Sequence, residues 1–248
     1  MSFFYYCNSL TSINLSGLSI NQITDISYLF YNCHSLKYID LSGFNTESVK
    51  YIEHMFESCY NLTSINFGNS FDTDKVTNMN SLFYHCHSLT RIDLPSNFII
   101  KMTNLTAFFS DCHSLTSINL DNFHNTNPSI GLNMNYMFRN CYSLKYINFS
   151  NFVFSRSNNM NYMFSGCYSL TSLNFLSSNN VSNSFNGIFF NCPNLTYVNF
   201  SFVNSSQTTN NLFNDNISEF GTLILNAKYY QKSLKNYKPP KKWTLILY

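Results

Sequence analysis

Charged residues are scarce in this chain, at 10% of its 248 residues, against about a quarter in typical globular proteins. The apolar fraction of 44% excludes a disordered chain, because disorder requires high charge and low hydrophobicity. No stretch approaches the ~18 consecutive apolar residues of a membrane-spanning helix. The chain has 7 glycines without a phosphate-binding glycine loop, and it lacks the G-x-S-x-G and H-E-x-x-H motifs. These absences predict a protein without catalytic activity, cofactor or membrane span.

What the chain has instead is a repeating unit marked by cysteine. Consecutive cysteines are separated by 26, 26, 27, 26, 29, 26 and 25 residues. A phenylalanine precedes each cysteine by three residues, and a leucine follows each by three. A period of roughly 20 to 50 residues is typical of solenoids, in which one unit stacks on the next. The cysteines are Cys7, Cys33, Cys59, Cys86, Cys112, Cys141, Cys167 and Cys192.

We number the positions of each repeat from its cysteine, which is position 0. Apolar residues recur at positions −7, −4, −3 and 0, as in Ile52, Met55, Phe56 and Cys59, and this spacing predicts a short helix. Alternating apolar residues at +6 and +8 predict a short strand after it. Identical units place such strands side by side and parallel. We therefore expect an α/β fold, with a parallel sheet on one face and short helices on the other.

The segments "LKYIDL" at residues 36–41 and "LTSINL" at residues 115–120 match the strand signature L-x-x-I-x-L of leucine-rich repeats. The longer pattern, with M-F-x-x-C-x-S-L before this strand, resembles the BspA-like leucine-rich repeat family over residues 3–227. The resemblance implies a leucine-rich-repeat solenoid over residues 1–227, with about eight repeats and a degenerate ninth, and a C-terminal cap over residues 228–248. The segments "GTLILN" and "PPKKWTLIL" are similar to the closing segment of such arrays.

The same resemblance implies a surface protein that binds a protein or glycan partner without catalysis. Surface members of the family carry an export signal, whereas "MSFFYYCNSL" at the start of this chain lacks a basic start and a clean apolar stretch. The compartment stays open between the cell surface and, for a complete chain, the cytoplasm. Phe4 and Cys7 already occupy repeat positions. We therefore expect either a longer protein or an uncapped first repeat that self-associates through its strand edge.

The charges are distributed unevenly along the chain. Residues 1–227 carry 8 Lys and Arg against 12 Asp and Glu, a net charge of −4, whereas the last 21 residues carry six lysines and no acid. Such a basic end can bind nucleic acid or an anionic membrane surface. The apolar stretch from Trp243 to Leu247 favours a docked cap with a solvated lysine face instead. We therefore expect no nucleic-acid partner.

The even number of cysteines permits disulfides, and repeated thiols can bind metals. A disulfide requires Cα atoms ~4.4–6.8 Å apart, whereas the expected helices would pack ~8–10 Å apart. The metal-binding spacings C-x-x-C and H-x(3–5)-H do not occur. Cysteine also behaves as a small, buried hydrophobic residue. We expect a column of buried free thiols.

Three outward positions are candidates for binding. Position +7 is Asn or Asp in every repeat, which favours a structural ladder over a sugar-binding or peptide-binding row. Position +1 holds His34, His87 and His113, and tyrosine, asparagine or proline in the other repeats, and we interpret it as an exposed column rather than a catalytic one.

Position +5 varies between repeats, as a recognition position should, although a merely solvated sheet surface stays open as an alternative. Tyrosines on a rigid frame provide a large contact area at low entropic cost. Lysines at +4 accompany two of the tyrosines. The predicted ligand-binding residues are Tyr38, Arg91, Tyr146, Tyr197, Lys37 and Lys145.

Overall fold

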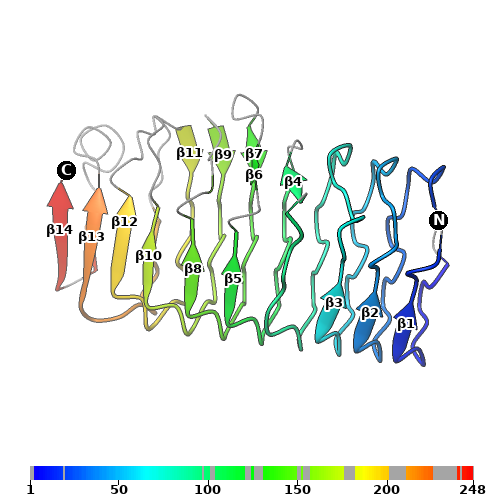
Figure 1. Ribbon diagram of the computed structural model, residues 1–248. Coiled ribbons are helices and arrows are strands. Elements are labelled where there is room, and N and C mark those ends of the chain that lie inside the picture. Colours follow the sequence, from blue (N-terminus) through cyan, green and yellow to red (C-terminus); the bar gives the residue numbers. More distant parts are fainter. Residues whose placement is uncertain are drawn as a thin grey trace.

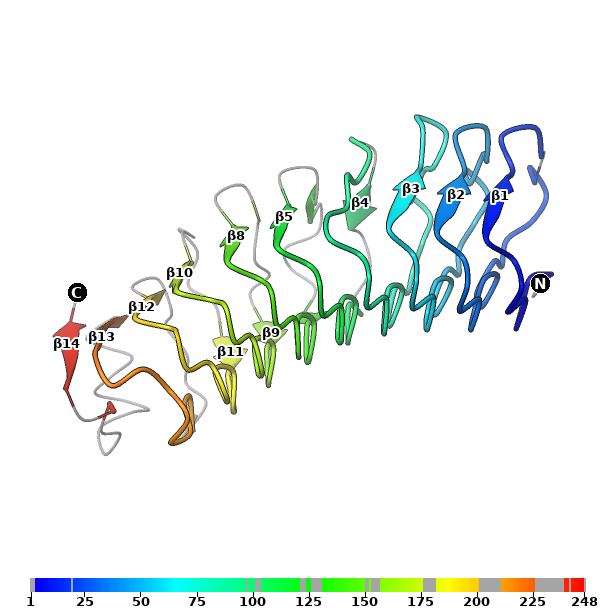
Figure 2. The same cartoon turned by 90° about the horizontal axis from the view of Figure 1, so that it is seen from below.

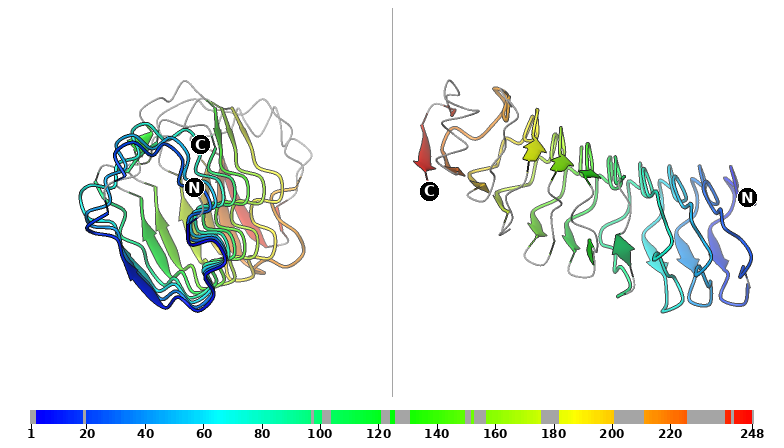
Figure 3. Two further views of the ribbon diagram at one scale, coloured as in Figure 1. Left: turned by 90° about the vertical axis from the view of Figure 1, so that its right-hand side faces the viewer. Right: turned by 90° about the horizontal axis from the view of Figure 1, so that it is seen from above.

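Successive repeats form successive coils of one elongated solenoid in the computed structural model, and the two termini lie at opposite ends (Figure 1). Viewed along the long axis, neighbouring coils follow similar paths that shift gradually from one end to the other (Figure 3). The solenoid architecture expected from the repeat period is therefore confirmed. The structure describes residues 3–18, 20–96, 98–100, 104–120, 124–125, 131–149, 152, 157–175, 182–200, 211–225, 239–240 and 242–247.

One row of parallel strands follows the repeats along the solenoid. Its members pair in register as β1-β2-β3, β5-β8 and β10-β12-β13-β14, so that equivalent positions of neighbouring repeats lie opposite each other. Residues 91–93 of the fourth repeat interrupt the row. The strands are β1 (Ser12–Asn14), β2 (Tyr38–Asp40), β3 (Ser64–Asn66), β5 (Ser117–Asn119), β8 (Tyr146–Asn148), β10 (Ser172–Asn174), β12 (Tyr197–Phe200), β13 (Gly221–Leu225) and β14 (Trp243–Leu247).

Further short strands form on other sides of the coil. The first pair is β4 (Ile99–Ile100) with β6 (His124–Asn125). The second set is β7 (Leu132–Asn133), β9 (Ser157–Asn159) and β11 (Ser182–Ser184), which pair in parallel. Single bridges from Asp25 to Tyr51 and from Tyr51 to Asn78 continue this second set toward the N-terminus. Parallel backbone pairing therefore joins the coils on more than one side.

The predicted helices are wrong: positions −7 to 0 form a run of tight turns, and the described part of the chain contains no helix. Alternate N–H groups donate along the solenoid axis to the next coil instead of within a helix. In the second repeat these bonds run from Tyr28 to Glu53, from Phe30 to Met55 and from Asn32 to Glu57, at 2.8–3.1 Å. The remaining N–H groups donate three residues back, as from Cys33 to Phe30 at 3.1 Å. No helix long and apolar enough to cross a bilayer occurs within these described residues.

The turn geometry depends on left-handed residues at positions −5 and −1, where φ lies between 54° and 78° in the second to eighth repeats. An α-helix cannot contain them, because every helical residue needs a negative φ. The neighbouring coil supplies the hydrogen-bond partners that a helix would otherwise provide for itself. Apolar residues at −7, −4, −3 and 0 still face inward, so the predicted core positions are right although the predicted element is not. In Figure 2 these turns lie together along one edge of the solenoid.

A stack of phenylalanine rings fills the core from end to end. The position −3 rings from Phe4 to Phe213 lie 5.2–6.1 Å apart, centroid to centroid, and the rings from Phe30 to Phe189 are fully buried. At the C-terminal end Trp243 packs on Phe213 at 5.0 Å, and its indole N–H donates to the Ser218 carbonyl at 2.9 Å. Trp243 belongs to β14, the last strand of the row. The boundary predicted at residue 227 lies outside the described residues.

The cysteines form a second inner column, as expected, and all eight are free thiols. All but Cys7 are fully buried. Burial raises the pKa of Cys33 to about 11 and that of Cys192 to about 12, and it raises the pKa of the five thiols between them well above the usual value. A thiol that stays protonated is a poor nucleophile and a poor metal ligand. The described residues also contain no group of His, Cys, Asp and Glu arranged to hold a metal ion.

Candidate recognition surfaces

The strand face presents position +5 to solvent, because side chains alternate along each strand and +6 points inward. Ile39 and Ile147 at +6 are buried, whereas their neighbours Tyr38 and Tyr146 are 40% and 58% exposed. Register pairs serine with tyrosine at this position, as Ser117 with Tyr146 and Ser172 with Tyr197. The column thus alternates a small residue with a large one from coil to coil.

The predicted ligand-binding residues lie on this face but form a row, not a pocket. Tyr38, Arg91, Tyr146 and Tyr197 belong to every second repeat, so neighbours in the row are two coils, roughly 10 Å, apart. Lys37 and Lys145 are exposed beside their tyrosines, Arg91 is exposed, and Tyr197 is half-buried. Among the described residues, the three tyrosine rings make no aromatic contact with one another. A partner would have to extend along the solenoid to touch several of them.

Arg91 differs from the tyrosines of the row because its guanidinium is already engaged. Its Nη2 lies 2.8 Å from Oδ2 of Asp93, and both side chains are more than 70% exposed. Such an exposed ion pair contributes ~0–1 kcal/mol to stability. It can therefore open to meet a ligand at little cost.

Position +7 makes structural contacts in the second and third repeats. Asp40 and Asn66 each accept a hydrogen bond from the backbone N–H two residues later, at 2.9 and 3.2 Å. The Asn66 amide donates to the Asp40 carboxylate at 3.1 Å, which links the two coils. The Ser42 N–H lowers the pKa of Asp40, because it donates to the charged carboxylate. These contacts agree with the predicted ladder at this position.

Position +1 forms a continuous stack of six rings, which the sequence indicated only as an exposed column. Adjacent rings lie 4.2–4.9 Å apart with interplanar angles of 9–19°. All but Tyr168 are half-buried. Burial and the nearby His113 lower the pKa of His87. In order, the rings are His34, Tyr60, His87, His113, Tyr142 and Tyr168.

Cysteine and histidine are adjacent in sequence in three repeats, but their side chains do not form a catalytic pair. The Cys33 thiol points inward and donates to the Phe4 carbonyl at 2.9 Å, whereas His34 lies outside against Asn32 and Tyr60. Cys86 and Cys112 likewise donate to backbone carbonyls of the preceding repeat. The described thiols therefore take part in packing rather than in chemistry.

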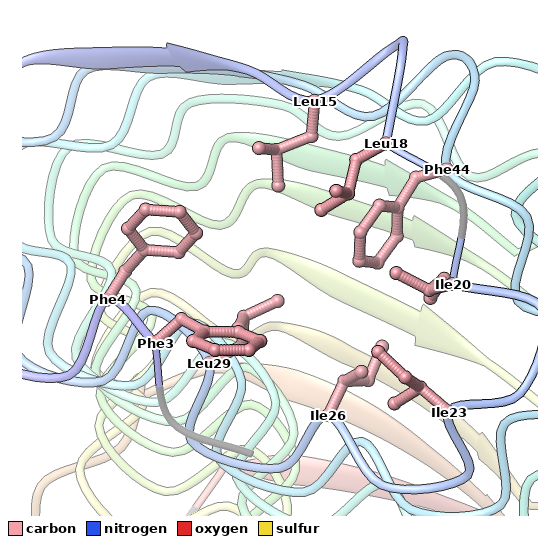
Figure 4. Close-up of a pocket in the computed structure, with 9 residues that line it drawn as sticks. All are labelled: Phe3, Phe4, Leu15, Leu18, Ile20, Ile23, Ile26, Leu29 and Phe44. Atoms are coloured by element: carbon pink, nitrogen blue, oxygen red, sulfur yellow. The ribbon is translucent and has the colours of Figure 1, made fainter.

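The N-terminal end of the solenoid carries an apolar cavity of about 250 Å³ (Figure 4). It opens on the interior of the first coils, where the phenylalanine stack ends at Phe4. Phe3 and Leu18 at its rim are 62% and 43% exposed. The remaining lining residues are Leu15, Ile20, Ile23, Ile26, Leu29 and Phe44.

Comparisons with known proteins agree with this architecture. Residues 1–123 match a Mycoplasma protein family of unknown function, and residues 77–220, more than half of the chain, match six copies of the BspA type leucine rich repeat region. Among curated proteins none matches this chain.

Three solved structures are similar in fold. A leucine rich repeat protein from T. pallidum is 24% identical over 75% of this chain and 78% of its own, with a TM-score of 0.50. A leucine-rich repeat protein from Bacteroides ovatus is 16% identical over 98% and 85%, with a TM-score of 0.30. A leucine rich cell surface protein from Faecalibacterium prausnitzii is 17% identical over 95% and 83%, with a TM-score of 0.33. Only the first superposes well enough to support the shared fold. The repeat match and the coil geometry together show that this chain belongs to the BspA-type leucine-rich repeat family, whose repeats are typical of recognition modules rather than enzymes.

Proposed function

We propose that this protein is a non-catalytic recognition module that binds a protein or glycan partner along its strand face. The observation that carries the proposal is the +5 column, in which tyrosine alternates with serine across paired parallel strands, with Arg91 in the tyrosine's place where the row is interrupted. The large rings provide contact area, and the smaller serines lie between them. A glycan ring or an extended peptide fits such a row better than a small isolated ligand does.

The flanking lysines add directional contacts to the tyrosines. Lys37 and Lys145 precede Tyr38 and Tyr146 and are exposed with them. An ammonium group and a phenol together can hydrogen-bond a carbonyl, a hydroxyl or a carboxylate. The sheet holds these groups in fixed register, so that little conformational entropy is lost on binding.

The test compares a double variant with a matched surface control. Ligands are first selected with the native chain as bait, from a glycan array and a displayed peptide library. Tyr38→Ser with Tyr146→Ser should abolish capture of the selected ligand and leave the melting curve unchanged. Tyr51→Ser removes a ring that is 44% exposed but lies outside the strand row, and it should bind normally. Undiminished capture by the double variant, or its unfolding, would show that the column does not serve recognition.

A second candidate function is assembly through the N-terminal end, favoured by the apolar cavity there. The partner at this end would be a second copy of the chain. Residues 3–24 contain no charged residue, so two such ends can meet without electrostatic repulsion. The outer edge of β1 has backbone groups that can pair antiparallel with β1 of the second copy.

Size-exclusion chromatography with light scattering distinguishes assembly through the N-terminal end from recognition along the strand face. Assembly predicts a concentration-dependent dimer that Leu18→Glu converts to a monomer, because the new charge would be buried at the contact. Glu47→Gln, at an exposed position elsewhere, should leave the dimer intact. A monodisperse monomer at high concentration contradicts the assembly role and leaves the strand-face proposal untouched.

A further inference from the structure

A cluster of tyrosine rings lies on the turn side of the first repeats, away from the strand row. The Tyr5 and Tyr31 rings stack at 5.0 Å, and Tyr6 meets both of them, at 4.6 and 5.8 Å. Tyr28 contacts Tyr31 edge to face at 5.5 Å and stacks on His54 at 4.7 Å. Tyr6, Tyr5 and Tyr28 are 51%, 45% and 37% exposed. These rings, with Glu53 and Glu57, form what we call the tyrosine–glutamate patch.

The patch holds two carboxylates that have no lysine or arginine partner among the described residues. Glu57 follows Tyr31 at position −2 of the next coil, and its side chain is only 13% exposed. Its ion-pair partner is the Nδ1 of His54. The Oε2 of Glu53 is buried without a hydrogen-bond partner. Neither glutamate forms an ion pair with a described lysine or arginine.

His54 is held at the edge of the patch by polar contacts at both ring nitrogens. Its Nδ1 contacts Oε2 of Glu57, and its Nε2 lies 3.0 Å from the side-chain amide of Asn80. Glu57 therefore shares its carboxylate with a histidine, whereas Oε2 of Glu53 has no partner.

The negative charge of Glu57 shifts the pKa of neighbouring tyrosines. Burial raises the pKa of Tyr28 and of Tyr31, and the charge of Glu57 raises both further. The buried Oε2 of Glu53 is costly, because it has lost water without gaining a hydrogen bond or a counter-charge. A cation brought to this surface would relieve that cost.

We propose that the tyrosine–glutamate patch binds an arginine or lysine side chain of a partner protein. Tyrosine faces attract cations through the ring quadrupole, and the two glutamates add the complementary charge. Arginine fits better than lysine, because its planar guanidinium stacks on a ring while its N–H groups reach a carboxylate. The same charge would repel a phosphate backbone, and a neutral glycan would leave Glu53 without a counter-charge.

The experiment uses a capped glycine–arginine repeat peptide as the probe, with the same peptide carrying neutral citrulline as the control ligand. Calorimetry on the full chain should show binding of the arginine peptide only. Tyr5→Ser and Glu57→Gln should each weaken it, by about two- to fivefold for the lost cation–π contact and by at least as much for the lost charge. Tyr146→Ser on the strand face should bind the probe as the native chain does.

Glu47→Gln separates a specific site from general attraction to surface carboxylates, because it removes one exposed negative charge outside the patch. Equal weakening by Glu47→Gln and Glu57→Gln, or equal binding of the citrulline peptide, would overturn the proposal. If Glu57→Gln lowers the melting temperature, the test uses the exposed tyrosines of the patch instead. Tyr5→Ser and Tyr6→Ser must then each weaken binding of the arginine peptide, and native affinity in both variants would also overturn the proposal.

Discussion

The thiol of Cys112 donates a hydrogen bond to the backbone carbonyl of Phe83, one repeat earlier, across 3.1 Å. The same bond recurs at every cysteine from Cys33 to Cys192, at 2.9–3.2 Å. The carbonyl also accepts the N–H of its own repeat's cysteine, as Cys86 donates to Phe83. Each cysteine therefore fills a small core site and links two coils at one atom.

Native thiol reactivity should be confined to one cysteine. Cys7 is half-buried and begins the column, whereas the other seven are fully buried with raised pKa values. Brief iodoacetamide treatment at pH 8, read by intact mass, should add one label to the folded chain and eight after denaturation. Two or more rapid adducts on the folded chain would contradict the buried column.

Alkaline pH should destabilise the fold. The thiol pKa is raised on folding, to about 11 for Cys33 and about 12 for Cys192, so the folded chain keeps protons that the unfolded chain releases above pH ~8.5. Their contribution to stability is therefore complete below that pH and is lost as pH rises toward the folded pKa values.

Urea unfolding between pH 8 and pH 11 measures this loss. We expect the unfolding free energy to fall by up to ~1.4 kcal/mol for each buried thiol and pH unit above pH ~8.5, so that the seven thiols together unfold the protein within the interval. The raised phenol pKa values of Tyr28 and Tyr31 act in the same direction. Cys192→Ala should show a shallower decline, and a flat native profile would refute the linkage.

Truncating one ring of the phenylalanine stack should strongly destabilise the fold. Phe109 is fully buried between Phe83 and Phe138, at 5.2 and 5.6 Å. Phe109→Ala leaves a cavity that rigid neighbouring coils cannot close, at a cost of ~3–5 kcal/mol in urea unfolding. The surface variant Tyr38→Ser should change stability by less than ~0.5 kcal/mol. Similar midpoints for the two variants would contradict the continuous stack.

A methyl group added at Gly187 should destabilise the turn column. Gly187 has a φ of 61°, and a Cβ there would lie 2.4 Å from Cε1 of Tyr162, whose ring is held by Tyr136 at 5.5 Å. Gly187→Ala should therefore cost ~1–3 kcal/mol. Gly17→Ala is the control, because a Cβ there meets nothing within 4 Å. Equal melting temperatures for the two variants would disprove the strain.

The core could be predicted from the sequence because its positions recur with one residue type. Phenylalanine at −3, cysteine at 0 and leucine at +3 identify inward positions in every repeat, and +6 and +8 identify the strand. The helix was mispredicted because inward spacings of three and four residues suit a coil of turns as well as a helix. Asn32, Asp111, Asn140, Gly166 and Asn191 at −1 were the available signal, since these residue types favour left-handed backbone.

The position of the strand-face residues could be predicted from the sequence, whereas the tyrosine–glutamate patch could not. Alternation along a strand determines the side to which Tyr38 points without knowledge of other repeats. The clustering of Tyr5, Tyr6 and Tyr28 depends instead on left-handed turns that bring positions −5, −2 and −1 to one surface. A helical assignment disperses those positions around its axis, so the cluster becomes visible only in the folded coil.

The axial direction of the hydrogen bonds has a mechanical consequence. Strand and turn bonds both join one coil to the next, so a pull between the two ends of the solenoid loads the few bonds of a terminal coil first. We expect the protein to unravel coil by coil under tension, each step freeing a repeat of about 26 residues, or ~90 Å of extended chain. Single-molecule stretching should record a regular series of small, evenly spaced ruptures. The protein would therefore lengthen stepwise under load instead of unfolding in one event.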